Sequence, residues 1–146
     1  MKYIYRTLFY PDRIYWFLVR PVVYGVGAII KEGDRVLMVR QTYGDRSVWH
    51  FPGGGKKKNE NPLEAISREV QEELGIKVKL SKLGEFEDIA EYRRVRSTCF
   101  YGHFDHDDIV IDKKEIEEAR WWSINMMPEN MSSVAKISFR LYLDTL

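Results

Sequence analysis

The alternation of hydrophobic and polar positions predicts a domain that mixes strands and helices. Residues 22–30 and 35–40 are rich in β-branched residues and are separated by a short polar turn, which predicts a β-hairpin. Further strand-like runs cover residues 78–83, 87–92, 95–104 and 119–123. A hairpin turn is expected at residues 103–108, between the last two of these runs. Strands outnumber helices, so the expected fold class is α/β or α+β.

One predicted helix, residues 62–74, has residues at both ends that favour its start and its stop. Asn61 can cap the N-terminus, Pro62 suits the first turn and Gly75 suits the C-terminal end. A second amphipathic helix, residues 134–143, follows near the end of the sequence. The apolar stripe expected to anchor the first helix consists of Leu63, Ile66, Val70 and Leu74.

A second stripe of the first helix carries three glutamates, Glu69, Glu72 and Glu73. Their spacing places the three carboxylates close together, and their mutual repulsion favours a cation between them. Oxygen ligands without a nearby Cys or paired His favour Mg²⁺ or Mn²⁺ over Zn²⁺. Acidic stripes are also typical of ordinary solvated helix faces. The stripe alone therefore leaves a metal site and a solvated face as alternatives.

The spacing of the surrounding segment favours the metal site. Five residues separate Gly54 from Glu60, and seven more separate Glu60 from Arg68. The segment from Gly54 to Ile76 resembles a complete Nudix box, and the resemblance extends over about residues 22–130. The matching positions are Gly54, Glu60, Arg68, Glu69, Val70, Glu72, Glu73, Gly75 and Ile76.

The resemblance implies a Nudix-type α/β/α sandwich with a mixed β-sheet and a catalytic loop-helix-loop. It implies a Mg²⁺-dependent pyrophosphohydrolase, with Mn²⁺ as a substitute, in which metal-activated water cleaves a phosphoanhydride bond. The substrate would be a nucleoside diphosphate linked to another moiety, such as a nucleotide sugar, ADP-ribose, a dinucleoside polyphosphate or a nucleoside triphosphate. The sequence does not distinguish among these substrates.

The same resemblance assigns roles to individual residues of the box. The expected catalytic set is Arg68, Glu69, Glu72 and Glu73. The three glutamates should bind the metal together with a backbone carbonyl of Gly54 or Gly55. Arg68 should orient the carboxylates through a salt bridge with Glu60, and Gly75 is a structural position of the box. The general base is left open between Glu69 and a glutamate of another loop; the candidates there are Glu115, Glu117 and Glu118.

Substrate contacts are expected from residues outside the box. Arg40 and Arg94 carry cations suited to an anionic substrate, although the alternation around Arg94 also fits a half-exposed strand. Tyr92 lies sixteen residues after Ile76 and resembles a position used by diadenosine polyphosphate hydrolases.

Two other functions are compatible with the family resemblance. A non-catalytic domain that binds or senses nucleotides would keep the fold, but such domains typically lose carboxylates of the box, and all are present here. An allylic diphosphate isomerase would need a paired Cys and Glu, and Cys99 lies outside such a context.

Length and composition indicate the number of domains, the class of partner and the compartment of the protein. The 146 residues suit a single domain, 1–146, with residues 1–20 as an aromatic, partly helical N-terminal extension. The net charge of +1 favours a small molecule over a stable nucleic-acid partner. Cys99 as the sole cysteine suggests a reducing compartment, so the cytoplasm is expected.

Membrane attachment and assembly are less constrained by the sequence. Charged residues and Pro11 interrupt the N-terminal segment too often for a membrane span, so no transmembrane segment is expected. Residues 15–19, flanked by arginines, leave binding at a bilayer surface as an alternative to packing on the domain. A homodimer is an expectation at the level of the family.

Overall fold

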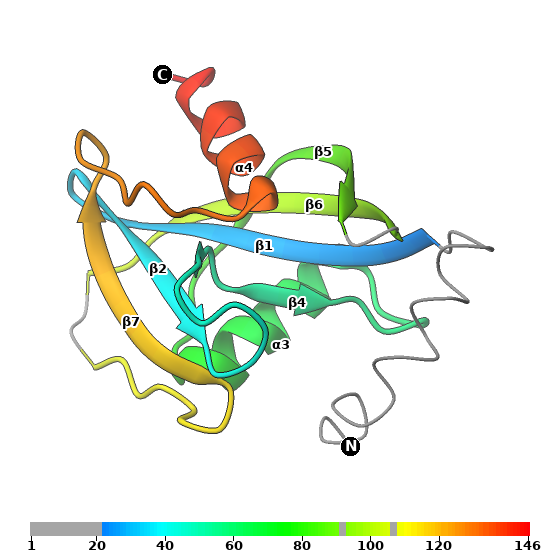
Figure 1. The fold of residues 1–146 in the computed structure, drawn as a ribbon, viewed down its shortest axis with the longest axis horizontal. Helices are drawn as coiled ribbons and strands as arrows, with labels where there is room; N and C mark the ends of the chain where they lie inside the picture. Colours follow the sequence, from blue (N-terminus) through cyan, green and yellow to red (C-terminus); the bar gives the residue numbers. More distant parts are fainter. Residues whose placement is uncertain (1–21, 91–92, 106–107) are drawn as a thin grey trace.

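The computed structural model describes residues 22–90, 93–105 and 108–146 (Figure 1). Within these residues seven strands form one mixed sheet and two helices pack on it. The strands are β1 (Val22–Glu32), β2 (Arg35–Gln41), β3 (Trp49–His50), β4 (Gly53–Gly55), β5 (Ser81–Ala90), β6 (Arg93–His103) and β7 (Ile116–Ser123). The helices are α3 (Pro62–Leu74) and α4 (Ser133–Leu143).

The central strand β1 has a different kind of neighbour on each edge. On one edge it pairs in parallel with β6 along ten residues, and β6 pairs antiparallel with β5. On the other edge β1 pairs with β2 only at Lys31 and Glu32, and with the short strand β4 at residues 25–27. The strand β2 therefore diverges from β1 beyond the hairpin, and β4 occupies part of the opening.

The two faces of the sheet carry separate hydrophobic cores because successive side chains of β1 point to opposite faces. Ala28 and Ile30 pack in the core that includes the apolar residues of α3. Ile29 packs in the core that includes Ala135 and Tyr142 of α4. Figure 1 shows α3 and α4 on opposite sides of the sheet. The expected α/β/α sandwich is thus the observed architecture.

Two expectations for the second half of the chain were wrong. The strands predicted at residues 78–83 and 87–92 are one strand, β5, whose interruption is a shift of register between Lys82 and Gly84. The strand β5 stays paired with the continuous strand β6 on both sides of the polar residues that suggested two separate strands. The expected hairpin between β6 and β7 is not seen among the described residues, because β7 pairs with β2 and not with β6.

The helices of the structure test the expectation that the chain has no transmembrane segment. No helix in the described ranges is long and apolar enough to cross a bilayer. The N-terminal extension, with the alternative of binding at a bilayer surface, lies outside the described residues.

Candidate active site

The helix α3 is fixed at both ends by the residues expected from the sequence. Asn61 is the N-cap, and its side-chain oxygen accepts a hydrogen bond of 2.9 Å from the backbone N–H of Glu64. Gly75 ends the helix in the left-handed conformation, at φ 66° and ψ 22°, and its N–H donates to the carbonyl of Gln71. One detail of the predicted apolar stripe was wrong, because Leu63 is 46% exposed and Ala65 is buried instead.

Two of the three box glutamates on α3 are buried. Glu69 is 5% exposed and Glu73 is 4% exposed, while Glu72 lies at the surface. One carboxylate oxygen of Glu73 accepts from the backbone N–H of Gly53 at 3.4 Å. Burying carboxylates is costly unless a cation or hydrogen-bond donors compensate for the lost water. A solvated acidic face therefore describes Glu72 and does not describe Glu69 or Glu73.

The glycine-rich strand β4 lies directly against these carboxylates. A Cβ atom at Gly54 would overlap the carboxylate of Glu69, so the absence of a side chain allows the strand and the helix to approach. Gly53 is equally constrained, since a Cβ there would meet the backbone of Val26. The backbone of β4 and the carboxylates of α3 thus form one compact unit.

Arg68 connects this unit through several hydrogen bonds. Its guanidinium donates twice to the carboxylate of Glu60, each at 2.8 Å, and once to Glu69 at 2.9 Å. It also reaches Glu72 at 3.3 Å and the carbonyl of Gly55 at 3.1 Å. The bonds from Arg68, followed by that from the Lys57 N–H, lower the pKa of Glu60 to about 2. The hydrogen bond to Glu60 is also the main reason that the pKa of Arg68 is raised. The salt bridge expected from the sequence is present.

The residues around Glu69 fit a hard divalent cation in their chemistry. Carboxylate oxygens dominate, and two of the carboxylates are buried next to backbone groups of β4. Such donors are the ones that Mg²⁺ binds in proteins. Within the described residues no three acidic, His or Cys side chains are close enough to enclose a metal ion. The charge and donor type therefore fit, although the described side chains do not enclose an ion in this structure.

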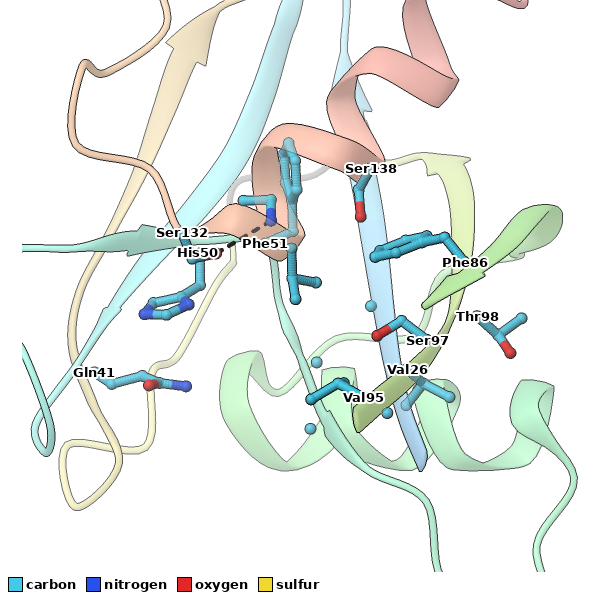
Figure 2. A pocket seen from close by; sticks show the side chains of 16 residues that line it. Val26, Gln41, His50, Phe51, Phe86, Val95, Ser97, Thr98, Ser132 and Ser138 are labelled. Carbon is cyan, nitrogen blue, oxygen red and sulfur yellow. Dashed lines mark hydrogen bonds between the residues drawn. The ribbon is translucent and has the colours of Figure 1, made fainter. Parts of the chain in front are cut away.

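A cavity of about 210 Å³ lies next to this unit, on the face of the sheet that α4 covers (Figure 2). Its lining contains no Asp, Glu, Lys or Arg side chain. The rings of Phe51 and Phe86 lie near α4, while Gln41 and His50 lie together at another side. Burial lowers the pKa of His50, an effect that the charge of Asp45 partly opposes, so the imidazole is neutral at pH 7.

Comparison with known proteins places this geometry in a family. The model of the NUDIX domain matches residues 21–142. The chain belongs to the Nudix hydrolase family. This finding confirms the resemblance based on the box from Gly54 to Ile76.

Individual relatives agree with the family. The chain is 32% identical over 99 residues to the NAD-capped RNA hydrolase NudC of Escherichia coli O9:H4 (strain HS), a match that covers 68% of this chain and 38% of NudC. The chain thus spans about two fifths of that relative's length.

Solved Nudix structures share the fold at low sequence identity. The MutT hydrolase of Burkholderia pseudomallei superposes with a TM-score of 0.75 at 22% identity, covering 82% of this chain and 97% of the other. The MutT protein of Methanosarcina mazei Go1 also has a TM-score of 0.75, at 24% identity, covering 87% of this chain and 97% of the other. The expected α/β fold is confirmed.

Two of the residues of this Nudix domain expected to contact substrate are absent from the cavity lining and form ion pairs, and the third lies outside the described residues. Arg40 donates to the carbonyl of Arg46 and to Glu118, and its guanidinium lies 5.3 Å from the ring centre of Trp49. Arg94 donates to Glu87. Their chain neighbours Gln41 and Val95 line the cavity. Tyr92 falls outside the described residues, so its predicted role stays a prediction.

The candidate bases outside the box are engaged elsewhere. Glu117 forms an ion pair with Arg46, and Glu118 forms ion pairs with Arg40 on the neighbouring strand β2 and with Arg120 on its own strand. Glu115 lies in the turn just before β7, where its backbone carbonyl accepts from the N–H of Thr42. These contacts join β7 and its preceding loop to β2 and the loop after it.

Cys99 does not offer the reactive thiol that an isomerase would need. It is 1% exposed in the core beneath α4, and burial raises the pKa of its thiol to about 11. The thiol is therefore protonated at neutral pH and a poor nucleophile.

The cavity was missed by sequence reasoning. Its lining comes from six separate segments, and most of its residues are ordinary strand residues in the sequence. The one available signal was the pair of glycines within the first strand, Gly25 and Gly27, because glycine inside a strand often marks close approach of a ligand or another backbone.

Proposed function

We propose that this chain is a Mg²⁺-dependent pyrophosphohydrolase that cleaves the phosphoanhydride bond of a nucleoside diphosphate linked to another moiety. The observation that carries this proposal is the burial of Glu69 and Glu73 against the backbone of β4. Both carboxylates lose water on burial, and the ion pair of Glu69 with Arg68 and the hydrogen bond from Gly53 to Glu73 offset part of that cost. A bound divalent cation would stabilise the two negative charges further and would account for their placement side by side.

The carboxylates of Glu69, Glu72 and Glu73 and the carbonyl of Gly54 are assigned to the metal, with Mn²⁺ as a substitute for Mg²⁺. When bound, the ion would neutralise phosphate oxygens and lower the pKa of the attacking water. The chain supplies the remaining requirement, which is a rigid arrangement of these oxygens. Gly54 allows Glu69 to approach β4, and the Gly53 N–H holds one oxygen of Glu73.

Arg68 acts as a positioning residue in this proposal. Its five hydrogen bonds connect Glu60 and the carbonyl of Gly55 with Glu69 and Glu72 on the helix. The guanidinium therefore fixes the loop after β4 relative to α3. Its fork of donors suits this role better than a lysine would, because a lysine cannot bond two carboxylates in fixed directions.

The cavity provides a place for the uncharged part of the substrate. Gly54 lines the cavity and also contacts Glu69, so the cavity and the carboxylates meet at one residue. A nucleoside in the cavity would carry its phosphates toward the carboxylates. We assign Arg40, Tyr92 and Arg94 to contacts with the outer part of an anionic substrate. The hydrolysis of NAD-capped RNA by a relative supports a substrate in which a nucleotide is joined through phosphates to a second group.

The decisive experiment is an assay of phosphate release coupled to a phosphatase, with and without Mg²⁺. The panel contains nucleotide sugars, ADP-ribose, dinucleoside polyphosphates, nucleoside triphosphates, NAD and NAD-capped RNA. Hydrolysis that requires Mg²⁺ supports the proposal and identifies the substrate class. A folded protein that binds nucleotides but hydrolyses none of the panel would instead support a non-catalytic sensing domain.

A further inference from the structure

Two glycines of β1 form part of the cavity floor without being required there by their neighbours. A Cβ at Gly27 would lie 3.8 Å from the carbonyl oxygen of Pro52, its nearest contact. A Cβ at Gly25 would lie 3.5 Å from the hydroxyl of Ser97. Both distances are ordinary van der Waals contacts, and neither residue has a positive φ. Packing and backbone conformation therefore do not explain these glycines.

A glycine inside a strand lowers stability relative to alanine, because the unfolded chain gains conformational freedom. Gly53, by comparison, is required by the close approach of Val26. At Gly25 and Gly27 the absence of a side chain instead leaves open space in the cavity. Space kept open at the expense of stability indicates an occupant.

Ser97 supplies a polar group aimed into the same space. It is the register partner of Gly25 on β6 and is only 5% exposed. Figure 2 shows its hydroxyl group directed into the cavity. Among the described residues, no hydrogen bond to this hydroxyl is present. The hydroxyl lines the open space of the cavity, so it is placed to form a hydrogen bond with a ligand there.

The remaining lining defines the chemistry of the occupant. No charged side chain contributes to the cavity, so a phosphate or a second charged group is not favoured inside it. Phe51 and Phe86 offer aromatic surfaces, and Gln41 and His50 add further uncharged hydrogen-bonding groups. A flat, uncharged ring with a polar edge fits this combination, and a nucleobase is the part of the proposed substrate with that character.

We propose that Ser97, together with the open space above Gly25 and Gly27, determines which nucleobase this enzyme accepts. The glycines make room for the ring, and the Ser97 hydroxyl forms a hydrogen bond with its edge. This inference rests on the proposed function, because it assigns the nucleoside part of the same substrate.

The test measures binding of the 5′-monophosphates of adenosine, guanosine, cytidine and uridine by calorimetry without metal. The variants are Ser97→Ala, which removes the hydroxyl, and Gly27→Ala, which fills the floor with a methyl group. Ser81→Ala and Gly84→Ala are the matched controls, since both lie on β5 outside the cavity and Gly84 has room for a methyl group. Steady-state kinetics on the preferred substrate from the hydrolysis panel complete the set.

We expect the wild type to prefer one base, and Ser97→Ala to weaken binding of that base by about tenfold while reducing the preference over the others. Gly27→Ala should weaken all four ligands, and the two controls should bind like the wild type. In turnover, Ser97→Ala should raise KM with little change in kcat.

The inference is overturned if the wild type binds none of the four monophosphates, or if both cavity variants keep its affinities and base preference. That conclusion holds even if Mg²⁺-dependent hydrolysis is observed. Conversely, binding that depends on Ser97 in a protein without hydrolytic activity would support the base site and overturn the proposed function alone.

Discussion

Gly54 and Glu69 lie so close together that a Cβ atom on Gly54 would be 2.6 Å from the carboxyl carbon of Glu69. It would also be 2.7 and 2.8 Å from the two carboxylate oxygens. These distances are far shorter than a normal contact between non-bonded atoms. Glu69 can therefore hold its carboxylate in this position only because residue 54 has no side chain.

Substitution of this glycine should therefore affect the chemistry more than the fold. Gly54→Ala should move the Glu69 carboxylate by a substantial fraction of an ångström and reduce kcat by about 100-fold, because misplaced catalytic groups lose rate steeply. The comparison is Gly55→Ala on the same strand, where a Cβ would meet nothing within 4 Å. Its effect should be much smaller. Equal losses of kcat in the two variants, measured alongside circular dichroism, would contradict this account of Gly54.

Glu73→Gln should remove a metal ligand while preserving the size of the buried side chain. We expect kcat/KM with Mg²⁺ to fall by more than about 100-fold, since even the loss of groups that only support metal ligands costs 10- to 100-fold. Glu64→Gln, an exposed substitution at the other end of α3, is the control. Rates should be measured over a range of Mg²⁺ concentrations. A Glu73→Gln protein with normal rates and a normal Mg²⁺ requirement would remove Glu73 from the metal site.

The ion pair between Glu60 and Arg68 should make stability depend on pH in the acid range. The pKa of Glu60 falls from 4.5 to about 2 on folding, mainly through hydrogen bonds from Arg68. A lowered pKa stabilises the folded state fully above pH 4.5, and this contribution is lost as the pH falls from 4.5 toward 2. Glu60→Gln lacks this contribution at every pH.

Urea unfolding of the wild type and Glu60→Gln at neutral pH and near pH 3 tests this relationship. The wild type should have the higher free energy of unfolding at neutral pH, and the difference should narrow at the lower pH. A difference that stays constant between the two conditions would show that the charge of Glu60 is not responsible.

Gly75 should be required for stability through its backbone conformation. Its φ of 66° lies in the left-handed region, where a side chain costs about 1–2 kcal/mol. Gly75→Ala should lower the free energy of unfolding by that amount. Gly84→Ala on β5 should have the opposite sign or no effect, because its backbone is ordinary and a methyl group fits. Thermal unfolding of both variants provides the measurement, and similar destabilisation by the two would refute the conformational explanation.

Local residue patterns were sufficient for α3 and for the identity of its box. The cap at Asn61, the stop at Gly75 and the spacing of the glutamates depend on backbone rules that act over a few residues. The pattern also led to the salt bridge between Arg68 and Glu60, because both positions are fixed by the box. Which side chains of α3 are buried could not be predicted as well from the sequence. Leu63 is exposed and Glu69 is buried, whereas a simple hydrophobic stripe would have the reverse.

The sequence by itself determined the family, the helix that carries the carboxylates and the chemistry that they favour. The tertiary structure decided that Glu69 and Glu73 are buried against β4, that β7 joins β2, and that a cavity opens where β2 diverges from β1. The physical reason is that helix caps and motif spacing are local, whereas strand order and burial arise from contacts between segments far apart in the chain. Ser97 illustrates the difference, since an ordinary strand serine becomes a candidate for base recognition only when β6 places it beside Gly25.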